Sequence, residues 1–386
     1  MNKIPTKKSG FNPNWQIKTL NEVCDKISAG GDKPDDCTTE KTEENQIPIF
    51  SNGIKNKGLC GYTKTPAITK PALTISARGT IGFACVRYEP FFPIVRLICV
   101  IPNEKLVVLE FLCYVLQYII PQGEGTSVPQ LTIPNFKKIE IPIPPLDEQK
   151  RIASALSKID AYLENTIKLI EEKERFKRGI AKKLLTCKEG ENIPEARFKG
   201  FEDEWEETQI LEFVNNNIIK IEKGKSITKS KIEEGDIPVI AGGKTPPYYH
   251  NKYNYNFPCI TISASGSAGY VWFHDYKIWA SDCHVIYTDN KRYNIKFLYH
   301  YLKNIQDLIY YLQVGGVQKH VYAKDLIKLN IPNITIEEQE KIGGYLSLLD
   351  EEIDNLKKQK ELIKEMKRGA MQKLLSGEVR LVDNYD

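Results

Sequence analysis

Two stretches of the chain carry apolar residues at the heptad spacing of helices with a narrow apolar face. In the first, the apolar positions are Ile152, Leu156, Ile159, Leu163 and Ile170, at intervals of 4, 3, 4 and 7 residues. In the second they are Ile342, Leu346, Leu349, Ile353, Leu356 and Ile363, at intervals of 4, 3, 4, 3 and 7. The residues between them are mostly Lys and Glu, so each stretch predicts a long helix that buries its seam against a partner helix.

Both predicted helices have a start signal. A proline-rich segment precedes Asp147, a candidate N-cap, and Thr335 with Glu338 forms a capping-box pattern. Because one chain supplies two such helices of matching length, we expect them to pair with each other.

The helices belong to a repeat. Residues 141–185 return as residues 331–375 without a gap, and 17 of the 45 paired positions are identical. The repeat extends upstream, where residues 75–82 match residues 262–269 at an offset of 187, and residues 109–116 match residues 295–302 at an offset of 186. The chain is therefore a tandem duplication of a globular region followed by a long helix.

Each globular region predicts a mixture of strands and helix. Short β-rich runs are bounded by Gly, Pro and Asn, at residues 72–76, 94–101, 259–263 and 284–288. One amphipathic helix follows in each half, at residues 109–120 and 295–312. A glycine-rich loop and a last strand then lead toward the long helix.

Composition narrows the class of protein. The 386 residues suffice for two or three domains, and 41% hydrophobic and 27% charged residues are ordinary for a soluble globular protein. A net charge of +4 permits nucleic-acid binding without demanding it. Residues 1–10 lack the apolar core of a signal peptide, and no apolar run is long enough for a membrane span. Nine cysteines without a Cys-x-x-Cys pair fit a reducing cytoplasm.

Several motifs resemble a known family. The proline-rich lead into Leu-Asp-Glu-Gln-Lys-Arg-Ile at residues 146–152, the Lys-Leu-Leu helix end at residues 183–185 and the segment at residues 194–205 resemble type I restriction-modification specificity subunits, the HsdS family. The Arg-Gly-Thr-Ile-Gly loop at residues 78–82 is typical of that family's target-recognition domains. The resemblance covers nearly the whole chain and includes its duplicated order.

The resemblance implies an α+β chain in which two mixed globular target-recognition domains are separated by two long helices forming an antiparallel coiled coil. The expected domains are residues 1–145 and 200–335, the expected coil helices residues 146–186 and 336–378, and the linker residues 187–199. The resemblance further implies a non-catalytic, cytoplasmic subunit that reads a bipartite site in double-stranded DNA, one half-site per domain. Modification subunits would dock on the coil and methylate adenine with S-adenosylmethionine. Restriction subunits would add cleavage that uses ATP and Mg, so this chain would hold no cofactor itself.

Candidate DNA-contacting residues lie in loops next to predicted strands. Lysines position a protein on phosphates, whereas Asn and Arg can read adenine and guanine edges. For Arg78 both a phosphate and a base contact stay open, and its counterpart in the second half is Ser265. A tight turn or a solvated loop would also explain these residue types. The candidates are Ser51, Asn52, Lys55, Lys57, Arg78, Gly79, Thr80, Gln130, Lys244, Tyr248, Asn251, Lys252, Ser265, Gly266, Gln318 and Lys319.

A second set of candidates lies near the ends of the long helices. It consists of Lys177, Arg178, Gly179, Lys367, Arg368 and Gly369. A glycine inside a helix costs about 1 kcal/mol relative to alanine, so its presence in both copies suggests close approach of another chain or helix. The neighbouring cations could contact a docked subunit. A fraying helix end whose cations complement the helix dipole is the alternative.

Signals for catalysis are weak. Thr245–Tyr248 resembles the Asp/Asn-Pro-Pro-Tyr motif of amino-methyltransferases, but threonine cannot present the required acceptor geometry, so we expect a surface turn. All five histidines lie in the second half, and no ligand pair has zinc-finger spacing. We therefore expect no catalytic, cofactor or metal site. Two alternatives stay open: a self-sufficient methyltransferase or nuclease with a fused specificity domain, and a coiled-coil scaffold without a DNA role.

Overall fold

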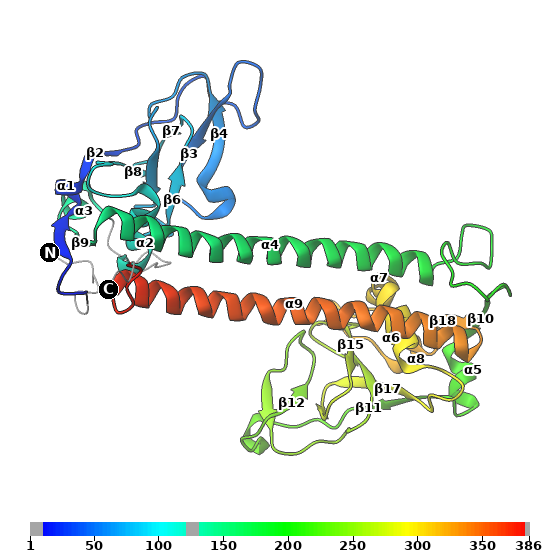
Figure 1. Cartoon of the computed structure of the whole chain (residues 1–386). Coiled ribbons are helices and arrows are strands. Elements are labelled where there is room, and N and C mark those ends of the chain that lie inside the picture. Colours follow the sequence, from blue (N-terminus) through cyan, green and yellow to red (C-terminus); the bar gives the residue numbers. More distant parts are fainter. Residues whose placement is uncertain (1–10, 121–130, 383–386) are drawn as a thin grey trace. The chain divides into compact units, whose positions relative to one another are not determined.

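The computed structural model describes residues 11–120 and 131–382 (Figure 1). The chain divides into two compact units, and both long helices take part in each of them. Unit 1 comprises residues 1–167 and 359–386, and unit 2 comprises residues 168–358. Within the described ranges, every helix is too short or too polar to cross a membrane.

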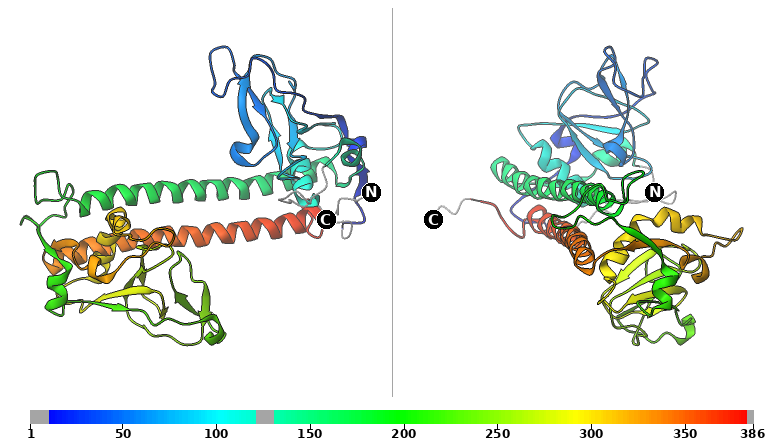
Figure 2. Two further views of the ribbon diagram at one scale, coloured as in Figure 1. Left: turned by 180° about the vertical axis from the view of Figure 1, so that it is seen from behind. Right: turned by 90° about the vertical axis from the view of Figure 1, so that its right-hand side faces the viewer.

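The two long helices are α4 (Leu146–Leu185) and α9 (Ile336–Ser376), which run side by side (Figure 2). In unit 1, Asp160 of α4 pairs with Lys367 of α9, and in unit 2, Lys177 of α4 pairs with Asp350 of α9. In unit 2 a second pair joins Glu174 of α4 to Lys357 of α9, so higher numbers on one helix meet lower numbers on the other and the helices are antiparallel there. The predicted pairing of two long helices is confirmed.

The starts of the two helices differ from the prediction in detail. Helix α4 begins at Leu146, so Asp147 lies in its first turn and is not the N-cap. The carbonyl of Pro145 already accepts a hydrogen bond from the Gln149 amide at 3.0 Å, which starts the helix one residue early. At α9, the hydroxyl of Thr335 accepts from the Glu338 amide at 3.4 Å, but the Glu338 carboxylate binds elsewhere, so half of the capping box forms.

The globular region of unit 1 combines three small sheets. A four-stranded antiparallel sheet has the order β2-β8-β5-β6, a three-stranded sheet the order β4-β3-β7, and β1 pairs with β9. Its elements are β1 (Gln16–Thr19), α1 (Leu20–Val23), β2 (Cys24–Ala29), β3 (Ile47–Phe50), the 3-10 helix η1 (Lys55–Gly58), β4 (Leu59–Thr63), β5 (Ala72–Ile75), β6 (Ala84–Arg87), β7 (Phe92–Pro93), β8 (Ile98–Pro102), α2 (Leu109–Ile119), α3 (Ile133–Lys137) and β9 (Glu140–Ile143).

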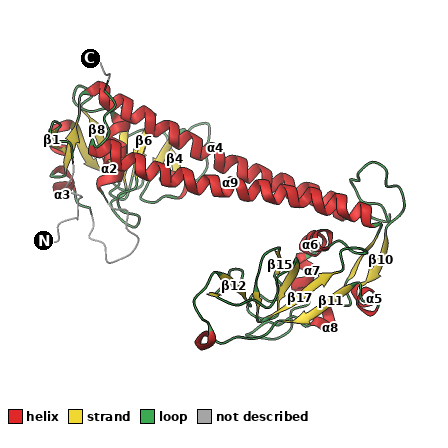
Figure 3. Ribbon diagram, turned by 60° about the horizontal axis from the view of Figure 1, so that its bottom comes forward, coloured by secondary structure: helices red, strands yellow, loops and turns green. Residues whose placement is uncertain are grey.

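Unit 2 repeats this topology. Its sheets have the orders β11-β17-β14-β15, β13-β12-β16 and β10-β18, which match those of unit 1 strand for strand. Figure 3 shows strands of unit 2 in yellow, among them β10, β11, β15 and β17. The elements are β10 (Glu206–Gln209), α5 (Ile210–Asn215), β11 (Ile219–Lys223), η2 (Lys229–Lys231), β12 (Ile237–Ile240), β13 (Tyr248–His250), β14 (Cys259–Ser263), β15 (Val271–His274), β16 (Trp279–Ala280), β17 (Cys283–Thr288), α6 (Ile295–Asn304), α7 (Gln306–Tyr311), α8 (Ala323–Leu326) and β18 (Asn330–Asn333). The duplication seen in the sequence is therefore a duplication of the fold.

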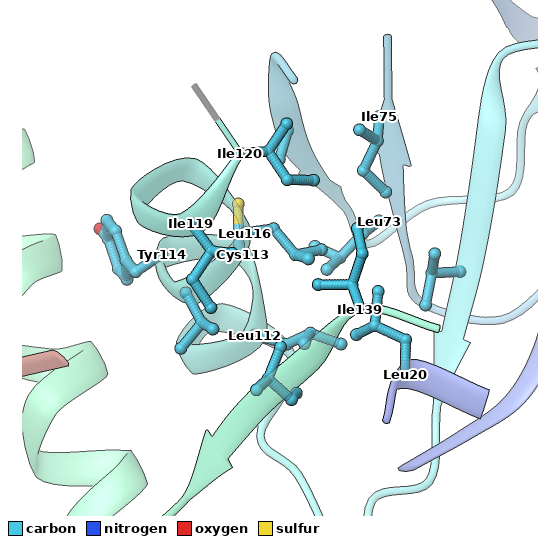
Figure 4. Close-up of a cluster of buried hydrophobic side chains, with 14 of the residues drawn as sticks. Leu20, Leu73, Ile75, Leu112, Cys113, Tyr114, Leu116, Ile119, Ile120 and Ile139 are labelled. Atoms are coloured by element: carbon cyan, nitrogen blue, oxygen red, sulfur yellow. The ribbon is translucent and has the colours of Figure 1, made fainter. Parts of the chain in front are cut away.

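The core of unit 1 joins the globular region to the long helices. Leu73 of β5 and Leu116 of α2 are fully buried in one cluster (Figure 4). The same cluster contains Leu156 of α4 and Leu375 of α9, both without exposed surface. Because the ends of both long helices lie in this core, the helices hold the globular region directly.

Two predicted elements are wrong in extent. The expected helix at residues 295–312 is divided into α6 and α7, because Ile305 leaves helical geometry. At this break, the side-chain amide of Gln306 accepts a hydrogen bond from the backbone N–H of Val271 at 3.1 Å. The same side chain donates a hydrogen bond to the Gly269 carbonyl at 2.7 Å. The expected strand at residues 94–101 begins only at Ile98, because residues 94–97 form a tight turn.

Candidate nucleic-acid interface

In unit 1, Asn52 connects three loops. Its side-chain oxygen accepts a hydrogen bond from the Ala77 amide at 2.8 Å, and its side-chain nitrogen donates to the Val95 carbonyl at 2.7 Å. Next to it, the Gly53 amide donates to the Ser76 hydroxyl at 3.2 Å. Both ends of the Asn52 amide are thus used by backbone groups, so in this conformation Asn52 positions the loops around it.

The lysines of the same loop are exposed. Lys55 and Lys57 lie on the 3-10 turn η1, where Asn56 and Lys57 have left-handed backbone angles, with φ of 49° and 53°. The Arg87 guanidinium donates to the Lys57 carbonyl and lies 3.5 Å from the centre of the Phe50 ring. Burial lowers the pKa of Arg87. Arg87 therefore fixes the backbone of the turn, while Lys55 and Lys57 face solvent.

The predicted glycine loop is a tight turn between neighbouring strands. Residues 76–83 connect β5 to β6, and Gly79 and Gly82 have φ of 66° and 83°, which glycine adopts without strain. Arg78 and Gly79 are exposed and Thr80 is half-buried, so the turn presents these three residues at the surface. In unit 2, Gly266 and Gly269 have the same left-handed angles, between β14 and β15. The glycines therefore form a turn in both units, and a contact between these loops and DNA stays a prediction.

Sequence reasoning missed a strained turn beside these loops. Val95 and Arg96 are exposed and both have left-handed backbone angles, with φ of 54° and 57°. A left-handed angle costs an ordinary residue roughly 1–2 kcal/mol, and it is a clear outlier for a β-branched one. The only sequence signal is the offset between the halves, which drops from 187 to 186 across this region. That drop marks one extra residue in the first half.

In unit 2 the corresponding loops pack closely. A Cβ added to Gly242 would lie 2.6 Å from the Ser265 carbonyl oxygen, and the Ser267 amide donates to the Gly242 carbonyl at 2.6 Å. The Ser265 hydroxyl donates to the Asp282 carboxylate. Lys244 is exposed, with its Nζ 5.6 Å from the centre of the Tyr270 ring. Ser265, Gly266 and Lys244 therefore share one surface in this unit.

A second patch of unit 2 lies at β13. Tyr248 is 38% exposed, and Lys229 lies over its ring with Nζ 5.9 Å from the centre. Asn251 and Lys252 both bind the Glu233 carboxylate, at 2.7 and 3.2 Å, and these contacts lower the pKa of Glu233. A phosphate would have to compete with this carboxylate for the two side chains. Gln318 and Lys319 are exposed elsewhere, beside a bridge between Val314 and His320. Gln130 lies outside the described residues.

The candidate docking residues occupy equivalent positions on the two long helices. Lys177 and Lys367 pair with aspartates across the helix pair, and Arg178, Gly179, Arg368 and Gly369 are exposed. A Cβ added at either glycine would meet no atom within 4 Å, so nothing in this chain's own packing requires glycine there. Phe176 and Met366, which precede the two motifs, are 54% and 49% exposed.

Several side chains of the core have large pKa changes. Burial lowers the pKa of His274 and His300 to about 3, and raises the pKa of Cys99 and Cys283 to about 12. These side chains are therefore neutral at physiological pH. Among the described residues, no group of three His, Cys, Asp or Glu side chains could hold a metal ion. The candidate residues exposed in the two units are mainly basic, amide and aromatic, which suits non-covalent binding of an anionic polymer.

A family model describes this combination. The model of the type I restriction modification DNA specificity domain matches the chain twice, at residues 12–172 and at residues 202–365. Each match contains one globular region and most of the long helix that follows it.

Individual proteins are similar over different lengths. A Methanocaldococcus jannaschii protein provisionally named the specificity subunit of type I restriction enzyme MjaX is 30% identical over 303 residues, or 72% of this chain and 70% of that protein. A Mycoplasma pneumoniae protein provisionally named type I specificity subunit S.MpnORF89P is 36% identical over 153 residues, or 39% of this chain, and the match spans 45% of that protein's length. The crystal structure of a type I restriction-modification S subunit from M. genitalium shares the fold, with a TM-score of 0.69 and 21% identity over 97% of this chain and 99% of that one.

Proposed function

Since the chain belongs to the family of type I restriction-modification DNA specificity subunits, we propose that it reads a bipartite DNA site for a multisubunit methyltransferase and endonuclease. Residues 1–145 and 200–335 are the two readers, each for one half-site in double-stranded DNA. The long helices carry the modification subunits, which bring S-adenosylmethionine. Restriction subunits bring ATP and Mg, and this chain holds no cofactor.

One observation supports two separate readers most directly. The two globular regions have the same topology, but equivalent loops carry different side chains, such as the exposed Arg78 in unit 1 and the half-buried Ser265 in unit 2. The helix pair, in contrast, repeats its contacts, since Lys367–Asp160 and Lys177–Asp350 are equivalent ion pairs. Repeated contacts in the helix pair suit binding of one kind of partner at two equivalent places. Loops that differ between the units suit recognition of two different DNA sequences.

The reading role is tested by exchanging one region. Residues 200–335 are replaced by the corresponding region of another specificity subunit, and the DNA methylated by the assembled complex is mapped. One half-site should change and the other should persist. The same chain without modification subunits should transfer no labelled methyl groups to DNA. Methyl transfer by the purified chain alone would favour a self-sufficient methyltransferase, and unchanged half-sites after the exchange would reject the two-reader model.

The docking role rests on the two glycines. Arg178 and Gly179 on α4, and Arg368 and Gly369 on α9, present a cation beside a helix surface without a side chain. The exposed Phe176 and Met366 add an apolar contact to each. A partner helix can approach the backbone closely at such a glycine, so the two equivalent surfaces suit two copies of one modification subunit.

A substitution at Gly179 tests the docking surface without damaging the chain. A Cβ at position 179 would meet no atom within 4 Å, and Gly179→Gln replaces a poor helix former by a good one, so the helix should be more stable by up to about 1 kcal/mol. Binding of the modification subunit should nevertheless weaken, as measured by titration of the labelled chain. Gly344→Gln is the matched control, because Gly344 is also exposed in a long helix with nothing within 4 Å. Equal binding by both variants would remove Gly179 from the docking surface.

A further inference from the structure

The turn before β8 in unit 1 and the turn before β17 in unit 2 occupy the same place in the fold. In unit 1 the Ile94 amide donates to the Phe50 carbonyl of β3 at 2.9 Å, and in unit 2 the Ser281 amide donates to the Ile240 carbonyl of β12 at 2.8 Å. At the other end, the Gly30 amide donates to the Leu97 carbonyl at 2.8 Å. In unit 2 the Gly224 amide donates to the Cys283 carbonyl at 2.9 Å. These bonds make Val95 and Arg96 the counterpart of the single residue Asp282.

The unit 1 turn is held on both sides. The Val95 amide donates to the Gly31 carbonyl at 2.8 Å, and the Arg96 amide donates to the Gly30 carbonyl at 2.9 Å. On the opposite side the Val95 carbonyl accepts from the Asn52 side chain at 2.7 Å. Backbone strain of this kind persists where the surroundings fix it, and it is concentrated at functional sites. The strained pair therefore projects from a rigid frame.

The turn lies beside the predicted reading loop. The same Asn52 side chain that donates to Val95 accepts from the Ala77 amide, one residue before Arg78. Arg78 and Arg96 are both exposed and flank this one amide. In unit 2 the equivalent pair is Ser265 and Asp282, which bind each other through the serine hydroxyl. The two units thus carry opposite charge at equivalent positions, next to equivalent glycine turns.

We propose that Arg96 and Asp282 are equivalent specificity-determining residues that contact base edges in the first and the second half-site. Arg96 pairs with a guanine, through its O6 and N7 acceptors, and Asp282 accepts from the exocyclic amino group of a base. Asn52 is the positioning residue for Arg96. The proposal rests on the proposed function, because it requires each unit to read one half-site.

The charge difference favours bases over phosphates as the contacts. The DNA backbone is negative everywhere, so a loop that faced phosphates in both units would hold a cation in both. A carboxylate at that position would be repelled by phosphates, whereas a base amino group is a hydrogen-bond donor that it can accept from. A rigid, strained turn also suits base reading, since a phosphate contact needs less exact placement of a long side chain.

The experiment compares methylation by the chain assembled with its modification subunits. Arg96→Gln should relax the requirement for one guanine in the first half-site by roughly 5- to 150-fold and leave the second half-site intact. Asp282→Asn should relax one position of the second half-site only. Lys70→Gln is the control, because Lys70 is exposed in unit 1 and lies in neither loop. The readouts are the mapped methylation motif and the salt dependence of DNA binding.

The outcomes distinguish failure of the proposed function from failure of the inference about Arg96 and Asp282. If the wild-type complex methylates no bipartite motif, the proposed function itself fails. If it does, but Arg96→Gln keeps the same motif and only weakens binding uniformly with a shallower salt dependence, Arg96 is a phosphate contact and the inference is overturned. Relaxation of both half-sites by either single variant would also overturn it. Thermal unfolding of each variant checks that the substitution leaves the fold intact.

Discussion

The Nζ atom of Lys367 on α9 lies 2.6 Å from a carboxylate oxygen of Asp160 on α4, and an equivalent pair joins Lys177 to Asp350. Each member of one pair is 190 residues from its counterpart in the other. In unit 1 the Tyr114 hydroxyl of α2 also donates to Asp160, at 2.8 Å. The repeated aspartate thus links both long helices to the globular region.

Asp160→Asn should destabilise unit 1 modestly. The ion pair is partly exposed, at 22% for Lys367 and 36% for Asp160, so its loss should lower the free energy of unfolding by about 1 kcal/mol or less. The weakened bond to Tyr114 should add a similar amount. Thermal unfolding measures the sum. Asp147→Asn serves as the control, because its pair with Lys150 is highly exposed and contributes little. Equal effects of the two changes would contradict the role given to Asp160.

A larger effect is expected at Glu148, which is 2% exposed. Arg380 binds its carboxylate with two nitrogens, at 2.5 and 2.7 Å, and Trp15 donates to it at 3.3 Å. Arg380→Met would leave a buried carboxylate without its cation, so we expect a loss of about 3–5 kcal/mol in unit 1. Adding Glu148→Gln should recover part of this loss. A double variant less stable than Arg380→Met alone would show that the charge of Glu148 is not what destabilises the single variant.

The sequence predicted the parts of this structure that depend on periodicity and repetition. Heptad spacing identified the two long helices, and the two-fold occurrence of the pattern indicated that they pair. The seven-residue gap between Leu163 and Ile170 is filled by Thr166, a buried residue whose hydroxyl donates to the Tyr162 carbonyl of its own helix. Because the buried Thr166 hydroxyl finds its hydrogen-bond partner within its own helix, a polar residue can occupy the seam, and the heptad pattern shows no apolar residue at that position.

The parts that were missed depend on contacts between distant segments. Neither Val95 nor Arg96 is a turn-forming residue, so local propensity predicts a continuous strand there. The turn forms because Gly30, Gly31 and Asn52 bind its backbone from other loops. From the sequence, Asn251 and Lys252 are likewise expected to have polar groups available for DNA, but in the structure both donate hydrogen bonds to the Glu233 carboxylate. Loop side chains acquire their partners from the tertiary fold, which a one-dimensional pattern does not contain.

Val95→Gly should distinguish the effect of backbone strain at Val95 on stability from the effect of the turn on DNA discrimination by Arg96. Glycine adopts the left-handed angle without the steric cost of valine, but it also increases the entropy of the unfolded chain. The net change in the free energy of unfolding should therefore lie between zero and about 1 kcal/mol of stabilisation. Discrimination in the first half-site should fall, because the turn that carries Arg96 becomes less rigid. A clear loss of thermal stability would show that the valine side chain contributes more than its backbone strain costs.

Unit 2 should lose stability in acid through buried histidines. Burial lowers the pKa of both His274 and His300 to about 3, against about 6.5 in an unfolded chain. Between these two values the unfolded chain binds protons that the folded unit excludes, so the free energy of unfolding decreases as the pH falls from about 6.5 toward 3. Each histidine contributes at most about 1.4 kcal/mol per pH unit. All five histidines of the chain lie in unit 2, so this dependence should be absent from unit 1.

His300→Tyr tests this dependence with the residue that the first copy uses at the same position, Tyr114. His300 faces Lys177 of α4 and lies 4.0 Å from Asp350 of α9, and Lys296 of its own helix further lowers its pKa. A tyrosine hydroxyl there should donate to Asp350 as Tyr114 donates to Asp160, with no proton to gain between pH 6.5 and 3. The slope of unfolding free energy against pH should therefore fall by about one proton, leaving the contribution of His274. Tryptophan fluorescence follows the transition, because three of the four tryptophans lie in unit 2. His320→Gln, in a half-buried loop position, is the control, and a slope that His300→Tyr does not change would mean that His300 is protonated in the folded unit.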